Sequence, residues 1–311
     1  MVAAVAGSAA FPLRPRLRWN WTFASSLALS AVAGSFLAGL FVLFVIQSLP
    51  VWKHEGVAYL TGTRWFYRDM QFGSLPMLYG SAIVSAMALL LAAPIGIGAG
   101  IFIAEYLPTR LRLPVKVAVE LLAGVPSVVY GLLGILFLRN WIYRVLTPFD
   151  PISGDTLLTA GLLLAVMVLP TVVTLTDDAL RGVSSTQRTA ARGLGLTRTE
   201  AVLAISIPQA GPGILAAVLL GLGRALGETI AVFLVVGRQD NQWPRHLFSP
   251  QPWIKAGQTL TSKLGGSETN IAYGDPLHWA AIVALGLILL VVVVSITLLG
   301  AQLARNRNPH A

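Results

Sequence analysis

The chain of 311 residues is 55% hydrophobic and only 11% charged, with a formal net charge of +9. Soluble domains carry about 25% charged residues, so this composition excludes a soluble enzyme, a disordered chain and a coiled coil. An integral membrane protein remains, and its excess of Lys and Arg is typical of cytoplasmic loops rather than of nucleic-acid binding.

Six apolar runs are long enough to cross a bilayer, which requires about 20 residues of helix. The first run is longer than the core of a signal peptide, about 7–15 residues, so we expect it to be retained. The sequence predicts an all-α membrane protein with six transmembrane helices. The runs occupy 25–49, 73–103, 121–138, 156–176, 211–237 and 277–304.

The third run contains Pro126 followed by Ser127. A helix broken at this proline would offer a backbone N–H or the Ser127 hydroxyl to an oxyanion. A simple proline kink, with the serine bonded back to its own helix, is the alternative interpretation.

Two short helices are predicted in the loop between the fourth and fifth runs, about 178–208, because the loop contains two capping boxes and suitable stop residues. On these features alone, an ordinary ordered loop is an equal alternative. The capping boxes are Ser184 with Gln187 and Thr197 with Glu200; Gly193 or Gly195 would end the first helix, and Pro208 the second.

The fifth run carries two charged residues, Arg224 and Glu228, whose spacing of four predicts one shared helix face. An arginine at mid-membrane costs about 2.5–3.5 kcal/mol on insertion scales, so such residues usually mark a pathway. The functional interpretation is a guanidinium that binds an oxyanion through its planar fork, with Glu228 as its resting partner. The alternative is a structural ion pair. Gly223 and Gly227 predict close helix packing.

The loop at 238–276 is long and rich in Gly, Pro, Ser and Asn, which is compatible with short helices or with partner contacts. Histidines are scattered and cysteine is absent, so neither a disulfide nor a metal site is predicted.

The distribution of Lys and Arg predicts the orientation. With the N-terminus inside, the cytoplasmic segments carry 12 of these residues and the outer loops carry 9. The cluster of Arg14, Arg16 and Arg18 before the first run contributes most to this difference. Six spans then place both termini in the cytoplasm.

The segment from Thr189 to Gly195, followed by Ile207-Pro208, resembles the EAA loop of ABC-importer permeases. In that family a short helix of this loop docks into a groove on the ATPase subunit. The resemblance implies that Ala190, Ala191 and Gly195 form the docking surface. The chain departs from the pattern at Thr189, where the family usually has Glu. Any ion pair that this Glu makes with the ATPase subunit is therefore not expected here.

Three further motifs resemble those of the phosphate-specific ABC permeases. The sequence that begins at Gly221 is more similar to the PstC-type than to the PstA-type subunit. The resemblance covers about residues 75–237. The motifs are Gly-Leu-Gly-Arg-Ala-Leu-Gly-Glu-Thr-Ile-Ala-Val from Gly221, Leu-Ala-Gly-Val-Pro-Ser-Val-Val-Tyr-Gly from Leu122, and Val-Leu-Pro-Thr from Val168.

This resemblance implies a type I ABC importer permease bundle in the inner membrane, in which Arg224 stabilises phosphate with Glu228, Ser127 and Thr229 nearby. It implies a first region at 1–72 and a permease core at 73–311. The implied partners are a second permease, two ATPase subunits, an extracytoplasmic phosphate-binding protein and membrane lipid. The chain lacks a G-x-x-x-x-G-K-[ST] loop, so we expect no enzymatic site or cofactor of its own and ATP only on the ATPase subunits.

Three alternatives remain open at this point. The cargo of the same permease class could be sulfate, molybdate or another oxyanion. A channel or a proton-coupled secondary carrier could use Arg224 and Glu228 as a relay. A third alternative is an assembly or sensor subunit that reports phosphate without moving it.

Overall fold

The computed structural model describes residues 21–149, 151–244 and 252–305. The chain divides into two parts, 1–43 and 44–311. In the first part, the described residues belong to helix α1 (Trp21–Glu55) and are mostly exposed. The basic cluster at Arg14, Arg16 and Arg18 lies outside the described residues.

Six helices long and apolar enough to cross a membrane occur in the described ranges, which confirms the predicted number of spans. The first, second, fourth and sixth spans lie close to the predicted runs. The third span begins later than predicted, and the fifth begins earlier and ends sooner. The six helices are Trp21–Glu55, Leu75–Tyr106, Ser127–Phe149, Leu157–Arg181, Arg198–Gly227 and Pro276–Leu303.

The third span differs from prediction because it follows a separate helix, α4 (Thr109–Ala123), that hydropathy alone does not mark. This helix carries basic residues and is amphipathic. It ends at Ala123, and the extended backbone at Pro126 (φ −57°, ψ 138°) leads into α5 (Ser127–Leu133). The predicted helix at 121–138 is therefore broken near its beginning.

Within the described residues, three spans contain a π-helical turn, at Phe102–Tyr106, Gly134–Leu138 and Val202–Ser206. The prediction that Pro208 ends a helix is wrong, because helix continues from Arg198 through the third of these turns to Gly227. A π turn before a proline widens the helix and changes its backbone hydrogen bonds at the point where the proline ring and the missing N–H would otherwise break the helix.

The remaining elements are short, apart from the spans α3, α7, α10 and α14. The structure also contains a hairpin of two-residue strands that was not predicted, in which Trp65 lies opposite Phe72. The bounds are α2 Ala58–Thr61, β1 Trp65–Phe66, β2 Gln71–Phe72, α3 Leu75–Ile101, α6 Arg139–Leu146, α7 Leu157–Arg181, α8 Ser185–Gly193, α9 Arg198–Ala201, α10 Ile207–Gly227, α11 Ile230–Val235, α12 Leu260–Leu264, α13 Glu268–Ala272 and α14 Pro276–Arg305, with 3-10 turns at Tyr67–Asp69 and Thr147–Phe149.

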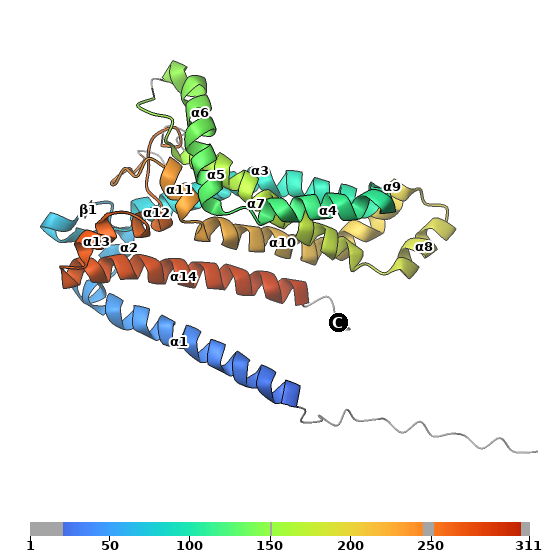
Figure 1. Cartoon of the computed structure of the whole chain (residues 1–311), viewed down its shortest axis with the longest axis horizontal. Helices are drawn as coiled ribbons and strands as arrows, with labels where there is room; N and C mark the ends of the chain where they lie inside the picture. Colours follow the sequence, from blue (N-terminus) through green and yellow to red (C-terminus); the bar gives the residue numbers. More distant parts are fainter. Residues whose placement is uncertain (1–20, 150, 245–251, 306–311) are drawn as a thin grey trace, which may run out of the picture. The chain divides into compact units, whose positions relative to one another are not determined.

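Helices α3, α7, α10 and α14 run side by side in the second part of the chain (Figure 1). Helices α8 and α9 lie at one end, which we call the inner end, and β1, α12 and α13 lie at the opposite, outer end. Small residues bring α3 against α7: a Cβ added at Gly96 would lie 2.9 Å from Val172, and one at Gly100 would lie 2.7 Å from Thr176. Such contacts let helices approach closely in a membrane.

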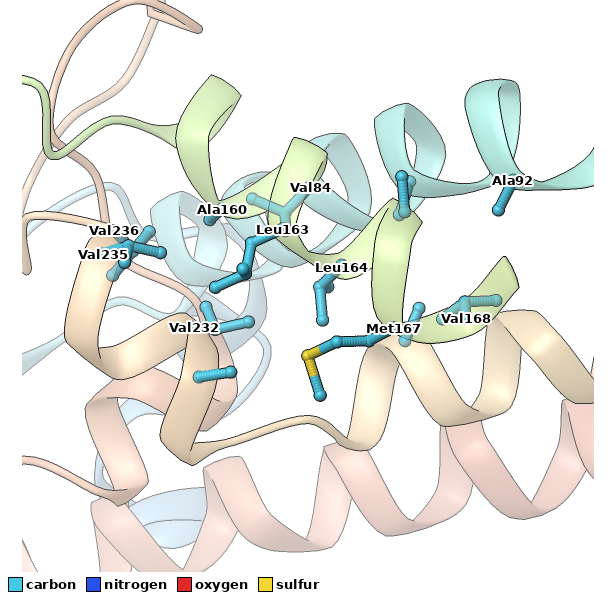
Figure 2. Packing of buried hydrophobic residues seen from close by; sticks show 14 of the residues in the cluster. Val84, Ala92, Ala160, Leu163, Leu164, Met167, Val168, Val232, Val235 and Val236 are labelled. Atoms are coloured by element: carbon cyan, nitrogen blue, oxygen red, sulfur yellow. The ribbon is translucent and has the colours of Figure 1, made fainter. Parts of the chain in front are cut away.

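Buried apolar side chains of α3, α7 and α11 form the largest core cluster. Figure 2 shows Leu163, Leu164 and Met167 of α7 between Val84 of α3 and Val232 of α11. The fourth span is thus the most buried of the six. It fixes the positions of its neighbours, including the segments that carry the site described below.

The outer end is closed by a buried polar segment at 258–263, which belongs to the long loop for which short helices were one predicted possibility. Thr259 and Ser262 form a capping box that starts α12. The Leu260 N–H donates to Ser81 Oγ of α3 at 2.9 Å. Gly80, next to Ser81, allows this approach, since a Cβ there would overlap the carbonyl oxygen of Gln258.

We expect the substitution Gly80→Ala to lower the free energy of unfolding by about 1–3 kcal/mol, because the added methyl group forces two backbones apart. The thermal midpoint of the detergent-solubilised chain measures the effect. Gly98→Ala on the same helix is the matched control, because a Cβ at Gly98 meets nothing within 4 Å. Equal midpoints for the two variants would contradict the described packing.

Candidate functional site

The fifth span is interrupted at the predicted charged pair. Helix α10 ends at Gly227, Glu228 has an extended backbone (φ −72°, ψ 120°), and α11 starts at Ile230. The prediction that Arg224 and Glu228 share one helix face is therefore wrong. The Glu228 carboxylate instead accepts the N–H of Ala231 at 3.2 Å and so caps α11, which stabilises the break.

Arg224 contacts two neighbouring helices rather than Glu228. Its Nη1 donates to Thr171 Oγ1 of α7 at 3.0 Å, and its Nη2 donates to the carbonyl oxygen of Ala123 at 3.3 Å. At a rise of about 1.5 Å per residue, Thr171 lies about 21 Å along α7 from its outer end and about 15 Å from its inner end. The guanidinium is consequently held near the middle of the bundle.

The two helix breaks meet at this guanidinium. Ala123 is the last residue of α4, so its carbonyl lacks a helical partner and accepts from Arg224. The Tyr130 hydroxyl donates to the adjacent carbonyl of Leu122 at 2.9 Å. The half-buried Ser127 begins α5 beyond the break. The Thr229 hydroxyl, in the other break, donates to the Gly227 carbonyl at 3.3 Å.

Arg224 is exposed on the surface of this chain, and Glu228 is half-buried. Within the described residues, Arg224 has no carboxylate within ion-pair distance, and both of its acceptors are neutral oxygens. A guanidinium at this depth without a counter-charge is costly in hydrocarbon. The arrangement can therefore bind an anion, whose oxygens would match the planar fork.

Sequence reasoning missed both partners of Arg224. Thr171 follows the proline of the Val-Leu-Pro-Thr motif, which is the one local signal for it. Ala123 carries no signal, because its backbone carbonyl and not its side chain makes the contact.

The loop after α7 contains one separate short helix, α8, as predicted, whereas the second predicted helix, α9, is the beginning of the fifth span. Thr197 and Glu200 make the predicted capping box, but Ser184 makes no side-chain cap, so that prediction is wrong. Gly195 ends α8 in a left-handed conformation (φ +88°), with the Leu196 N–H donating to the Ala191 carbonyl at 3.2 Å.

The predicted docking residues do not all face outward. Thr189, Ala190 and Gly195 are exposed, whereas Ala191 is only 2% exposed. Ala191 is therefore not available to a docking surface. The Thr189 hydroxyl donates to the Ser185 carbonyl of its own helix at 2.9 Å.

Leu194 is a residue of this loop that the sequence analysis did not single out. It is 83% exposed and lies between Gly193 and Gly195. An apolar side chain this exposed at the inner end is suited to contact with another protein. An isolated leucine between two glycines was the available signal.

The outer end contains a second charged cluster, around the buried Lys263. Its Nζ contacts the carboxylates of Asp240 (2.7 Å) and Glu268, and it lies 5.0 Å from the centre of the Trp65 ring. Glu268 Oε1 also accepts from Trp65 Nε1 at 2.5 Å and lies 2.8 Å from His278 Nε2. A cavity of about 260 Å³ borders this cluster.

The two carboxylates respond differently to their surroundings. Burial raises the pKa of Asp240, and Lys263 only partly opposes this rise. Burial acts in the same direction on Glu268, but hydrogen bonds from Lys263, Trp65 and His278 outweigh it and leave the pKa of Glu268 below its ordinary value. Lys263 therefore compensates two partly buried charges.

Comparison with known proteins gives consistent matches. The model of the family described as "Binding-protein-dependent transport system inner membrane component" matches residues 96–308. The chain is 36% identical to the phosphate transport system permease protein PstC of Mesorhizobium japonicum over 272 residues, covering 82% of this chain and 80% of that protein. It is 33% identical to PstC of Haemophilus influenzae, covering 85% of each.

Among solved structures, an inward-facing MetNI methionine ABC transporter matches with a TM-score of 0.55 at 15% identity. The match covers 74% of this chain and 93% of that one. At this identity the match supports the fold alone. It confirms the predicted type I importer permease bundle.

Proposed function

The chain belongs to the binding-protein-dependent transport system inner membrane components and, within them, to the PstC phosphate permeases; on this basis we propose that it forms the path by which an ATP-driven importer moves inorganic phosphate across the inner membrane. It is a multi-pass membrane protein. As an ABC permease subunit it has no ATPase site of its own, and separate subunits hydrolyse ATP.

The observation that carries the assignment of the site is the uncompensated Arg224 between two helix breaks. Its fork, now donating to two neutral oxygens, would exchange the weaker 3.3 Å contact with Ala123 for a phosphate oxygen. Broken membrane helices commonly place exposed backbone groups at a substrate. Ser127 and Thr229, beside the two breaks, are the nearby hydroxyls that we assign to the same path.

We assign Glu228 a different role from the one expected from sequence. Because its carboxylate caps α11, it supports the shape of the break rather than neutralising Arg224. Arg224 then has only neutral hydrogen-bond acceptors among the described residues, and its charge is available to the anion in the resting chain. The exposure of Arg224 supports a path at a boundary with a second permease subunit.

The full importer would contain this chain, a second permease, two ATPase subunits and an extracytoplasmic phosphate-binding protein, surrounded by lipid. No nucleic-acid partner or bound cofactor is part of the proposal. We propose that residues 73–311 form the permease core, with both termini in the cytoplasm. ATP binding would draw the docking helices together and open the path outward.

Radiolabelled phosphate uptake tests this function in cells that lack their own high-affinity importer and express this chain with its partners. We expect uptake that requires this chain and an active ATPase and that excess sulfate or molybdate does not inhibit. Inhibition by those anions would change the cargo but keep the class. Uptake with an inactive ATPase would indicate a channel or secondary carrier, and phosphate signalling without uptake would indicate a sensor.

The exposed leucine of the docking loop gives a separate prediction. We expect Leu194→Asp to reduce recovery of the ATPase with the solubilised permease by about tenfold, since a buried apolar contact of about 1.4 kcal/mol or more is replaced by a charge that must lose its water. The recovered ATPase is measured after affinity purification of the permease. The control is Val57→Asp, an exposed apolar residue at the outer end. Equal recovery would place the docking contact elsewhere in the loop.

A further inference from the structure

Glu105 is a buried acid at the inner end of α3, in the π turn Phe102–Tyr106. Its side chain is only 6% exposed. A buried carboxylate is costly unless a cation compensates it. The residue that does so here belongs to the docking loop.

Arg188 of helix α8 reaches from the docking loop to the permease bundle. Its Nη2 lies 3.1 Å from Glu105 Oε1 and also donates to the carbonyl of Leu180, near the end of α7. A single guanidinium therefore joins the docking helix to the inner ends of two spans, α3 and α7.

Helix α9, which follows α8 and begins the fifth span, contacts the same turn of α3. Arg198 donates to the carbonyl oxygen of Glu105 and lies 5.4 Å from the centre of the Tyr106 ring. The Tyr106 hydroxyl donates to Thr199 Oγ1 at 3.3 Å. Movement of the docking loop thus acts on the end of α3 through three side chains.

An ion pair also joins the inner end of α7 to α4. The buried Asp177 of α7 contacts Lys116 of α4 at 3.3 Å and Arg181 at 2.8 Å. Helices α7 and α4 carry Thr171 and Ala123, the two groups that hold Arg224. A continuous series of contacts therefore leads from α8 to the helices that position Arg224.

The contact between Glu105 and Arg188 is close but incompletely bonded. Arg188 Nη2 lies within ion-pair distance of the buried Glu105 Oε1 without a well-directed hydrogen bond to it, and the buried Arg188 Nε has no hydrogen-bond partner among the described residues. An arginine fork that engaged both carboxylate oxygens would satisfy these atoms. The pair can accordingly tighten when α8 moves, which is the property required of an element with two arrangements.

We propose that Glu105 and Arg188 are positioning residues that transmit movement of the docking helix to α3 and α7 and so couple ATP hydrolysis to phosphate transport. The proposal rests on the proposed function as an ATP-driven permease. Arg192, on the same helix, is exposed and has no ion pair among the described residues, so it provides a matched control.

The test measures ATP hydrolysis and phosphate transport together in proteoliposomes that contain the complete importer and the phosphate-binding protein. We expect Glu105→Gln and Arg188→Gln to assemble with the ATPase and hydrolyse ATP, while the ATP consumed per phosphate rises at least about fivefold, the lower range of couplings between sites. Arg192→Gln should match the wild type, and the exchange Glu105→Arg with Arg188→Glu should lower the ratio toward that of the wild type.

An unchanged ratio in both single variants would overturn the proposal while leaving the proposed function intact. Loss of assembly in both would also overturn it, because the pair would then be structural; Arg188, 23% exposed, is the more tolerant of the two positions. Failure of the wild-type complex to move phosphate would instead reject the proposed function.

Discussion

Phosphate uptake is expected to fall about 100-fold or more in Arg224→Gln, because removal of one preorganised donor from an anion site commonly costs that much. Glutamine retains a neutral donor but loses the charge and the fork that can hold two oxygens. Initial uptake rates at saturating phosphate, normalised to the amount of chain in the membrane, measure the effect.

Two variants make this result specific. Arg144→Gln removes an exposed arginine of α6, far along the chain from either break, and should leave uptake unchanged. Arg224→Lys keeps the charge without the planar fork, so its rate should lie between those of the glutamine variant and the wild type. Wild-type uptake in Arg224→Gln would mean that the phosphate path lies elsewhere and that Arg224 serves packing.

The substitution Lys263→Met is expected to lower the free energy of unfolding by about 3–5 kcal/mol, the usual effect of removing one partner from a buried ion pair. Methionine fills much of the same space, but Asp240 and Glu268 lose the ammonium group between them. Thermal unfolding of the solubilised chain measures the loss. Lys255→Met, an exposed lysine in the same outer loop, should have little effect.

The loss should also depend on pH. Since Lys263 helps hold the pKa of Glu268 below its ordinary value, the stability it supplies through Glu268 is fully present above the unfolded pKa. That stability disappears as the pH falls through the lower, folded pKa. The difference between the wild type and Lys263→Met should therefore be largest near neutral pH and shrink in acid. A difference independent of pH would show that Lys263 acts through packing alone.

The features that could be predicted from the sequence are those set by composition or by adjacent residues. Runs of about 20 apolar residues determine the spans regardless of tertiary contacts. The Thr197 capping box formed because its hydrogen bonds are local to residues 197–200. The capping box predicted for Ser184 and Gln187 is absent, because the Ser184 side chain makes no capping hydrogen bond.

The geometry around Arg224 depends on contacts between distant segments. A spacing of four residues predicts a shared face only if the helix is continuous, and α10 stops between Arg224 and Glu228. The partners Thr171 and Ala123 are 53 and 101 residues away along the chain. Helix α4 escaped detection because its charges reduce its hydropathy, although it leads directly into the break.

The π turn at Val202–Ser206 allows the number of residues in the fifth span to change without changing the direction of the Arg224 side chain. Such a turn holds one residue more than an α-helical turn while leaving the helices on either side nearly in phase. Deletion of one residue within it would restore regular helix with Arg224 still directed at Thr171. The same deletion farther along α10 would rotate Arg224 by about 100°. This wide turn is thus the place in the span where evolution or design can remove a residue without redirecting the guanidinium.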